Sequence, residues 1–167
     1  GEIFNAERLF DVMIQYVKTK LERAEVNSVK ALLYAGTGKY EEAVNICINE
    51  LNNLGIKVPA NPGKLDIVRE VLVYKWQMRN KSIADLAELP EIKNPVQNKV
   101  AQLLIGLIFA TCTSHPDLYA FAVIKAGNHA VKYGNTDTSS IGYLGYAITE
   151  GTGLGNYDVG DELGKMS

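Results

Sequence analysis

Apolar residues recur along the chain at intervals of three and four, the spacing that places side chains on one face of an α-helix. The segment from residue 40 shows this pattern clearly, because its opposite face is rich in asparagine and glutamate. Its apolar face consists of Tyr40, Ala43, Cys47, Leu51 and Leu54. Strand-like alternation of apolar and polar residues is nearly absent. The pattern predicts an all-α protein.

About eight helices are expected, separated by turns that contain glycine or proline. Their expected ranges are 3–18, 22–35, 40–54, 65–79, 96–113 and 117–134, one helix from residue 138 or 139, and one after residues 151–155. The fourth helix carries Val68, Val71, Leu72 and Trp76. No glycine or proline separates the first two ranges, so a single helix over residues 3–35 remains an alternative. A short extra helix is expected within residues 80–95, with Ser82 as its N-cap and Pro90 as its stop.

The predicted helices suggest one helical-repeat segment, residues 1–167, cut from a larger protein. The chain opens with Gly1 rather than methionine and closes on DELGKMS without a clear stop signal. We expect three parts: residues 1–55 with the first helices and a repeat turn, residues 56–95 as a connector with one helix and a short helix, and residues 96–167 as apolar helical pairs. The last part is poor in charge and carries small residues at helical spacing, among them Gly142, Gly145 and Ala147. Small residues let helix backbones approach closely, and a charge-poor surface is typical of one covered by neighbouring units.

A short pattern, Gly-x-Tyr-acid-x-small, occurs twice. It reads GKYEEA at residues 38–43 and GNYDVG at residues 155–160, and the copies are 117 residues apart, or three units of 39. Helical-hairpin repeats have periods of roughly 34 to 47 residues. Glycine permits the positive φ that ends one helix, the tyrosine is expected to pack back across the corner, and the small residue lets the next helix approach. Helices joined in this way are antiparallel neighbours.

These residues resemble the tetratricopeptide motif, in which a helix ends at Gly-x-Tyr/Phe and the next helix has an alanine one turn on. The resemblance gives repeat-turn roles to Ala31, Tyr34, Gly38, Tyr40, Ala43, Gly155, Tyr157 and Gly160. Glu50 stands where the family has a small residue, and proline is delayed to Pro59, so the unit is divergent. The resemblance implies a right-handed α-α superhelix of antiparallel helix pairs, with a protein partner on its concave face.

A longer resemblance covers nearly the whole chain. It rests on three stretches in order: LLYAGTGKYEEAVNICINELNNLGIKVP (32–59), SIADLAELPEIKNP (82–95), and residues 115–164 from HPDLYAFAV to GNYDVGDELG. They resemble the helical segment that follows the ATPase module in very large bacterial signalling proteins, which also carry a serine/threonine-kinase-like domain, a GAF domain and a histidine kinase or similar output. The resemblance implies a non-catalytic interaction and coupling scaffold whose partners are other domains of the same polypeptide. It carries over no catalytic residue and no cofactor.

Composition narrows the choice of partners and of compartment. The net charge of −2 gives no electrostatic reason to expect nucleic acid, which needs clustered lysine and arginine. The most apolar run, residues 103–112, is about half a membrane span. Two cysteines are too few for a disulfide framework. We therefore expect a cytoplasmic protein with no membrane span.

Several partial motifs for chemistry fail on spacing. In a phosphate-binding loop that ends at Gly38-Lys39, Leu33 would stand at the first glycine and Tyr40 at the metal-binding hydroxyl. The GTGLGN stretch at residues 151–156 lacks a preceding strand and the dinucleotide spacing. The adjacent acids at 41–42 and 161–162 point apart on helices. No catalytic residue is therefore predicted.

A zinc site is also not predicted, although Cys112, His115 and His129 invite the interpretation. A structural site needs four ligands, and the only other thiol, Cys47, lies on a core stripe. His129 shares a polar stripe with Lys125, Asn128 and Lys132 and is expected to be solvated.

The alternative function is a small-ligand sensor with an apolar pocket between helices. Such a pocket is expected near Trp76 and the connector of residues 80–95. Tyr119 and Tyr133, at helical spacing, are interpreted as core edge rather than ligand contacts.

Overall fold

The computed structural model of the chain describes residues 2–166, and the prediction of an all-α protein is confirmed for them. The helices are α1 (Glu2–Tyr16), α2 (Lys20–Gly36), α3 (Tyr40–Asn53), α4 (Lys64–Met78), α5 (Ile83–Ala87), α6 (Pro95–Thr111), α7 (Pro116–Tyr133), α8 (Ser139–Ile148), the π-helical turn η1 (Thr149–Gly153) and α9 (Tyr157–Met166). The expected eight helices correspond to all of these except the short α5 and η1. Within residues 2–166, β-structure is limited to an isolated bridge between Glu91 and Asn135.

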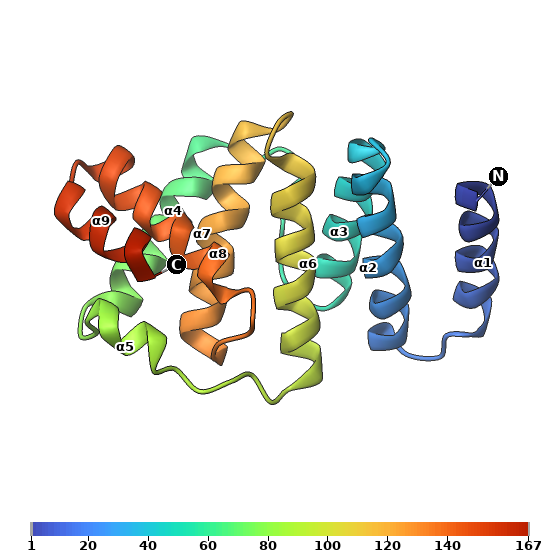
Figure 1. Ribbon diagram of the computed structural model, residues 1–167, viewed down its shortest axis with the longest axis horizontal. Coiled ribbons are helices and arrows are strands. Elements are labelled where there is room, and N and C mark those ends of the chain that lie inside the picture. Colours follow the sequence, from blue (N-terminus) through green and yellow to red (C-terminus); the bar gives the residue numbers. More distant parts are fainter. Residues whose placement is uncertain (1, 167) are drawn as a thin grey trace.

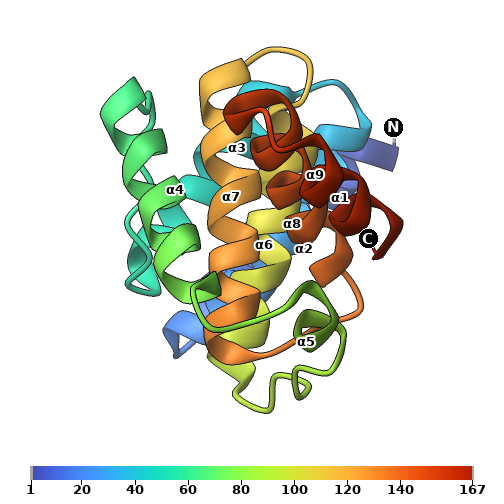
Figure 2. The ribbon, with the colours of Figure 1, turned by 90° about the vertical axis from the view of Figure 1, so that its left-hand side faces the viewer.

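The helices form a row along the long axis of the molecule, with α1 at one end and α9 near the other (Figure 1). Sequence neighbours pack as pairs: α2 with α3, α6 with α7, and α8 with α9. The pairs are joined through contacts of α3 with α6 and of α7 with α8. Helix α4 leaves this order and packs against α7, on the side away from α8 and α9 (Figure 2).

The first two helices are separate, which decides between the alternatives for residues 3–35. Helix α2 begins after Thr19, whose side-chain oxygen accepts a hydrogen bond from the backbone N–H of Glu22 at 3.1 Å. The Glu22 carboxylate accepts in return from the Thr19 N–H at 3.0 Å. This reciprocal capping box satisfies two donors at a helix start. The motif Thr-x-x-Glu was therefore the sequence signal for the boundary, in place of glycine or proline.

The close contact of α7 and α8 depends on glycine. A Cβ atom at Gly142 would lie 2.6 Å from the backbone nitrogen of Gly127, and one at Gly145 would lie 2.8 Å from the side chain of Val123. Cβ atoms do not approach other heavy atoms that closely, so only hydrogen fits at these positions. The small residues predicted to allow close helix packing do so here.

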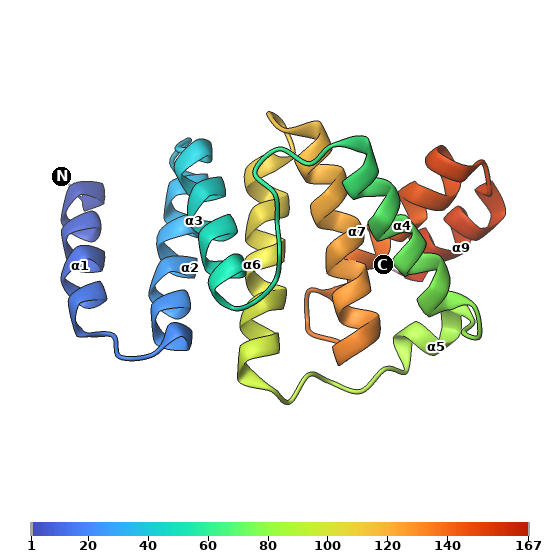
Figure 3. The same cartoon turned by 180° about the vertical axis from the view of Figure 1, so that it is seen from behind.

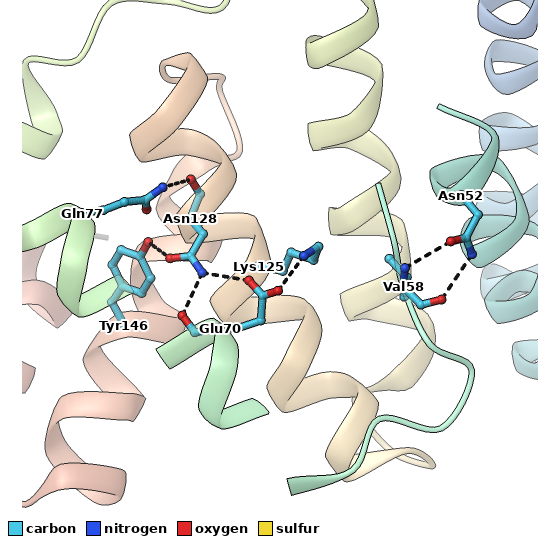
Figure 4. A network of polar contacts seen from close by, with 7 residues as sticks. All are labelled: Asn52, Val58, Glu70, Gln77, Lys125, Asn128 and Tyr146. Carbon is cyan, nitrogen blue, oxygen red and sulfur yellow. Dashed lines mark hydrogen bonds and ion pairs between the residues drawn. The ribbon is translucent and has the colours of Figure 1, made fainter. Parts of the chain in front are cut away.

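Helix α4 has the predicted range, but most of the apolar residues noted on it face outward. Val68, Leu72 and Trp76 are each more than half exposed. The buried residues of α4 are instead Glu70 and Tyr74. The physical reason is a polar network that holds the opposite side of the helix (Figure 4).

That network joins α4 to α7 and α8. The Asn128 side-chain amide donates to the backbone carbonyl and to the carboxylate of Glu70, at 3.0 Å each. Lys125 donates to the other carboxylate oxygen of Glu70 at 2.6 Å, and the Tyr146 hydroxyl donates to Asn128 at 2.7 Å. Gln77 donates to the Asn128 carbonyl at 3.2 Å. A buried carboxylate and amide with these partners anchor α4 through its polar side.

A second set of contacts anchors α4 from the start of η1. The Tyr74 hydroxyl and the Lys75 ammonium both donate to one carboxylate oxygen of Glu150, at 2.6 and 2.5 Å. Asn156 donates to the other oxygen at 2.7 Å. Burial raises the pKa of Glu150, but the hydrogen bonds from Asn156, Lys75 and Tyr74 together lower it below the ordinary value. Glu150 is therefore ionised at neutral pH while it lies in the interior.

The two connectors are held by specific hydrogen bonds. Asn52 at the end of α3 both donates to and accepts from the backbone of Val58, at 3.2 Å each (Figure 4). In the second connector, Ser82 caps α5 as predicted, since its hydroxyl accepts from the Asp85 N–H. Gly134 has a φ of 112°, and a Cβ there would lie 2.2 Å from the Pro90 carbonyl oxygen. The connector therefore crosses the end of α7 in direct backbone contact.

Candidate functional site

An apolar groove lies between α2 and α6, with α3 as its floor. Its volume is about 200 Å³. Figure 1 shows α3 behind α2 and α6. Its walls include Leu32 of α2 and Phe109 of α6, whose side chains are 58% and 54% exposed. The other lining residues are Ser28, Cys47, Gln102, Leu103, Ile105, Gly106 and Thr138.

The floor of the groove is formed where α6 crosses α3. A Cβ at Gly106 would lie 3.4 Å from the Cys47 sulfur, so the two helices approach closely at this point. Burial raises the pKa of the Cys47 thiol to about 12. The thiol stays protonated at neutral pH and acts as a small apolar group. Together with buried Leu103 it gives the groove an apolar base.

One end of the groove has a polar rim. The Lys99 ammonium donates to the Gln102 side chain at 2.7 Å and to the Ser28 hydroxyl at 3.4 Å. This contact ties α6 to α2 beside the opening. Further along α2, Val29 is also more than half exposed. The result is an apolar strip with one charged border, which is the surface character of a protein-binding site.

A buried glutamate of α3 holds α3 against α2. These two helices form the floor and one wall of the α2–α6 groove. Glu50 of α3 accepts from the Arg23 guanidinium at 3.0 Å and from the Asn27 amide at 2.8 Å. Its other carboxylate oxygen has no hydrogen-bond partner in the described part of the chain. Sequence reasoning noted Glu50 only as a departure from the tetratricopeptide pattern. The spacing of Arg23 and Asn27, one helical turn apart on α2, was the signal for a shared partner.

The repeat-turn residues of the first copy lie together at the α2–α3 corner. Gly38 has a φ of 81°, and α3 begins at Tyr40. Ala31 and Ala43 are buried. Tyr34 lies under the Lys39 ammonium, which is 4.9 Å from its ring centroid. The same Lys39 donates to Glu7 of α1 at 2.6 Å, so this lysine joins α1 to the corner.

The second copy has the same positive-φ glycine before a helix, and its tyrosine is more exposed than Tyr40, which is 42% exposed. Gly155 has a φ of 76°, and α9 begins at Tyr157. A Cβ at Gly160 would lie 3.0 Å from the backbone of Ala147 and of Gly151, which agrees with the need for a small residue. The expectation that the tyrosine packs across the corner is wrong here, because Tyr157 is 71% exposed.

The expectation for His129 is also wrong. Its side chain is 6% exposed, its Nε2 atom is 3.0 Å from the Gln97 side-chain oxygen, and its ring packs against Tyr133 at 4.8 Å between centroids. The polar stripe of Lys125 and Asn128 that suggested a solvated face is instead covered by α4, through Glu70.

The other two candidate zinc ligands have partners of their own. His115 lies 3.2 Å from Glu41, and the Cys112 thiol donates to the Phe109 carbonyl. Among residues 2–166 no three histidine, cysteine or acidic side chains gather in a metal-binding arrangement.

A hollow does occur near Trp76, where the sensor interpretation expected an apolar pocket. It has a volume of about 330 Å³ and lies between the end of α4 and the end of α7. It is lined by Trp76, Gln77, Arg79, Asn80, Lys81, Val131 and Lys132. Three of these carry positive charge and none is acidic, so the hollow combines cationic groups with the apolar side chains of Trp76 and Val131. The α2–α6 groove is the more apolar of the two cavities.

Comparison with known proteins assigns the chain to no family. No protein-family model, no curated protein and no solved structure matches the chain. Among the described helices, none is both long enough and apolar enough to span a membrane. What the geometry defines is an all-α protein with an open apolar groove between two helices.

Proposed function

We propose that this chain is a non-catalytic interaction and coupling scaffold within a multidomain cytoplasmic signalling protein that also carries kinase and ATPase modules. The observation that supports this is the α2–α6 groove, whose walls carry apolar side chains more than half exposed. Contiguous exposed apolar surface is typical of protein-binding sites. The resemblance to helical segments of large bacterial signalling proteins supplies the context. Two unpaired cysteines fit a reducing compartment.

The position of the groove suggests how binding is coupled to other modules. It lies between α2 of one helix pair and α6 of another, so a bound segment contacts both pairs at once. In a tetratricopeptide-like superhelix the pairs share a continuous core, and a change of angle at one junction alters the path of the array. In this proposal the partner is another domain of the same polypeptide or a separate protein on the concave face. The attached modules respond to that change.

Replacement of Leu32 and Phe109 by aspartate in the parent polypeptide is expected to reduce signal-dependent output at least about tenfold, which corresponds to about 1.4 kcal/mol of lost binding. The physical reason is that two carboxylates would have to be desolvated in an apolar groove when the partner binds. Both side chains are more than half exposed, so each change is expected to alter stability by less than about 0.5 kcal/mol. The measurement is the signalling output of the parent polypeptide, compared in the presence and in the absence of its signal.

The matched control for that experiment is Leu154→Asp, at an exposed apolar position that does not line the groove. This variant is expected to keep its output. The proposal is contradicted if the groove double variant keeps both its melting temperature and its full signal-dependent output.

A second candidate function, a small-ligand sensor, is favoured by the size and lining of the same groove. Engineered apolar cavities of about 150 Å³ bind benzene-sized ligands. Native mass spectrometry of the purified chain separates the two candidates. A retained small apolar molecule, lost in the Leu32 and Phe109 double variant, supports the sensor.

A further inference from the structure

Helix α4 exposes an apolar stripe that is separate from the α2–α6 groove. Figure 3 shows α4 in front of α7, and no residue of α4 lines the α2–α6 groove. The stripe consists of Leu65, Val68, Leu72 and Trp76, which are 85, 52, 64 and 65% exposed. Because Glu70 and Tyr74 hold the other side of α4 against the body, the helix cannot turn this stripe inward without breaking the Glu70 contacts in Figure 4 and the hydrogen bond from Tyr74 to Glu150.

The spacing within the stripe is that of a helix-packing seam. Successive members are three, four and four residues apart, which is the spacing of knobs along one face of a helix that packs lengthwise against another helix. The stripe extends over about 16 Å, at 1.5 Å per residue, and Val73 beside it is 37% exposed. A seam of this shape matches a second helix, bound through apolar side chains at i, i+3, i+4 and i+7.

The charges beside the stripe are positive. Arg69 is exposed on α4, and Arg79 is exposed directly after the helix, with its guanidinium 4.5 Å from the Trp76 ring centroid. The cationic hollow at the end of the stripe adds Lys81 and Lys132. These groups line one edge and one end of the seam.

The carboxylates of α4 do not neutralise these cations. Asp66 accepts from the Gly63 N–H at 2.8 Å and so caps the start of the helix. Glu70 is buried and pairs with Lys125. The α4 seam, meaning the four apolar residues with their positive border, therefore combines apolar surface with uncompensated positive charge.

We propose that the α4 seam binds an amphipathic helix with acidic flanks that belongs to a partner protein. Apolar side chains of that helix pack along Leu65, Val68 and Leu72. Its carboxylates pair with Arg69 along the edge, and its end enters the cationic hollow beside Trp76. Charge complementarity of this kind selects an acidic helix over a basic one and speeds association.

A helix fits the seam better than an anionic membrane surface does. Membrane-surface helices present a broad apolar face with cations along both borders. Here Lys81 and Lys132 line a concave hollow at the end of the stripe, which a flat surface does not enter. A second copy of the chain is the remaining alternative, and the experiment below separates all three.

Trp76 is the only tryptophan of the chain, so its fluorescence reports on the seam alone. The probe is a synthetic three-heptad helix with leucine at positions a and d and glutamate at e and g. Titration is expected to shift Trp76 emission to shorter wavelength, with micromolar affinity, because the exposed indole becomes buried. A matched peptide with lysine at e and g is expected to bind about tenfold more weakly.

Variants of the protein make the test specific. The double variant Arg69→Glu with Lys81→Glu is expected to bind the glutamate peptide about tenfold more weakly and the lysine peptide more tightly. The variant Leu72→Asp is expected to abolish the shift of Trp76 emission. Leu32→Asp, in the α2–α6 groove, is expected to leave the shift unchanged, so failure of the proposed function and failure of this inference are distinguishable.

Three outcomes overturn the inference. The first is no shift with the glutamate peptide, or equal affinity for both peptides. The second is a shift with vesicles of phosphatidylserine and phosphatidylcholine but not with the peptide, which indicates a membrane. The third is a shift that appears on concentrating the protein alone, which indicates a second copy.

Discussion

Replacement of Gly142 by alanine is expected to lower the free energy of unfolding by about 3 kcal/mol, near the upper end of the usual cost of overpacking. The added Cβ would lie 2.6 Å from the Gly127 nitrogen and 2.9 Å from the Ala126 carbonyl carbon. These are backbone atoms of α7, so α7 and α8 would have to separate. Helix propensity alone predicts the opposite sign, a gain of up to about 1 kcal/mol. Urea denaturation measures which effect wins.

The matched control is Gly164→Ala in α9, where a Cβ would meet no other group within 4 Å. This variant is expected to be neutral or up to about 1 kcal/mol more stable than the parent chain. A Gly142→Ala protein as stable as the Gly164→Ala protein would contradict the close contact of α7 and α8.

Lowering the pH from 7 to 5 is expected to reduce the free energy of unfolding by about 2 kcal/mol through His129. Burial, and then the charges of Lys132 and Lys125, lower the pKa of His129 from 6.5 to about 4. The folded chain therefore keeps a neutral imidazole in a range where the unfolded chain is protonated. Between pH 4 and 6.5 the unfolded state binds more protons than the folded state, so the free energy of unfolding rises with pH across that window. Above pH 6.5 the contribution of His129 no longer changes with pH.

The variant His129→Gln separates this effect from the titration of carboxylates. Glutamine can still donate a hydrogen bond to Gln97 but does not titrate. Between pH 7 and 5 the variant is therefore expected to lose about 2 kcal/mol less free energy of unfolding than the parent chain does. Nuclear magnetic resonance gives the pKa of His129 directly, with His115 as an internal comparison. A His129 pKa near 6.5 would show that the ring is not buried as described.

The helices themselves could be predicted from the sequence because their signals are local. Ser82 and Gly134 mark a start and a stop, since α5 begins directly after Ser82 and α7 ends directly before Gly134. Pro90 was predicted as the stop of α5, which ends at Ala87, three residues before it. The boundary between α1 and α2 was also local, in the Thr19 and Glu22 capping box, but a search for glycine and proline alone does not find it.

The orientation of α4 could not be predicted, because the groups that hold it are far apart in the sequence. Glu70 meets Asn128 and Tyr74 meets Glu150, at separations of 58 and 76 residues. Periodicity identifies which residues share a face, but not which face is inside. The usual assumption that the apolar face is buried is wrong for α4, because its polar face finds buried partners.

The α2–α6 groove was missed for a related reason. Leu32 and Phe109 lie on helices that meet only in the fold, and each belongs to a pattern that predicts burial. The position of Gly106 against Cys47, which brings α6 onto α3, has no sequence signature apart from a glycine inside an apolar helix. Such a glycine indicates close approach without naming the partner.

Site-specific photo-crosslinking tests most directly whether the α2–α6 groove holds a protein segment. A benzophenone amino acid is placed at position 32 or 109 of the parent polypeptide, and at position 154 as a control, and the adducts are mapped by mass spectrometry. We expect positions 32 and 109 to crosslink to one and the same peptide of another domain or protein, and position 154 not to do so. Absence of an adduct at both groove positions, or the same adducts at position 154, would contradict a protein-binding role for the groove.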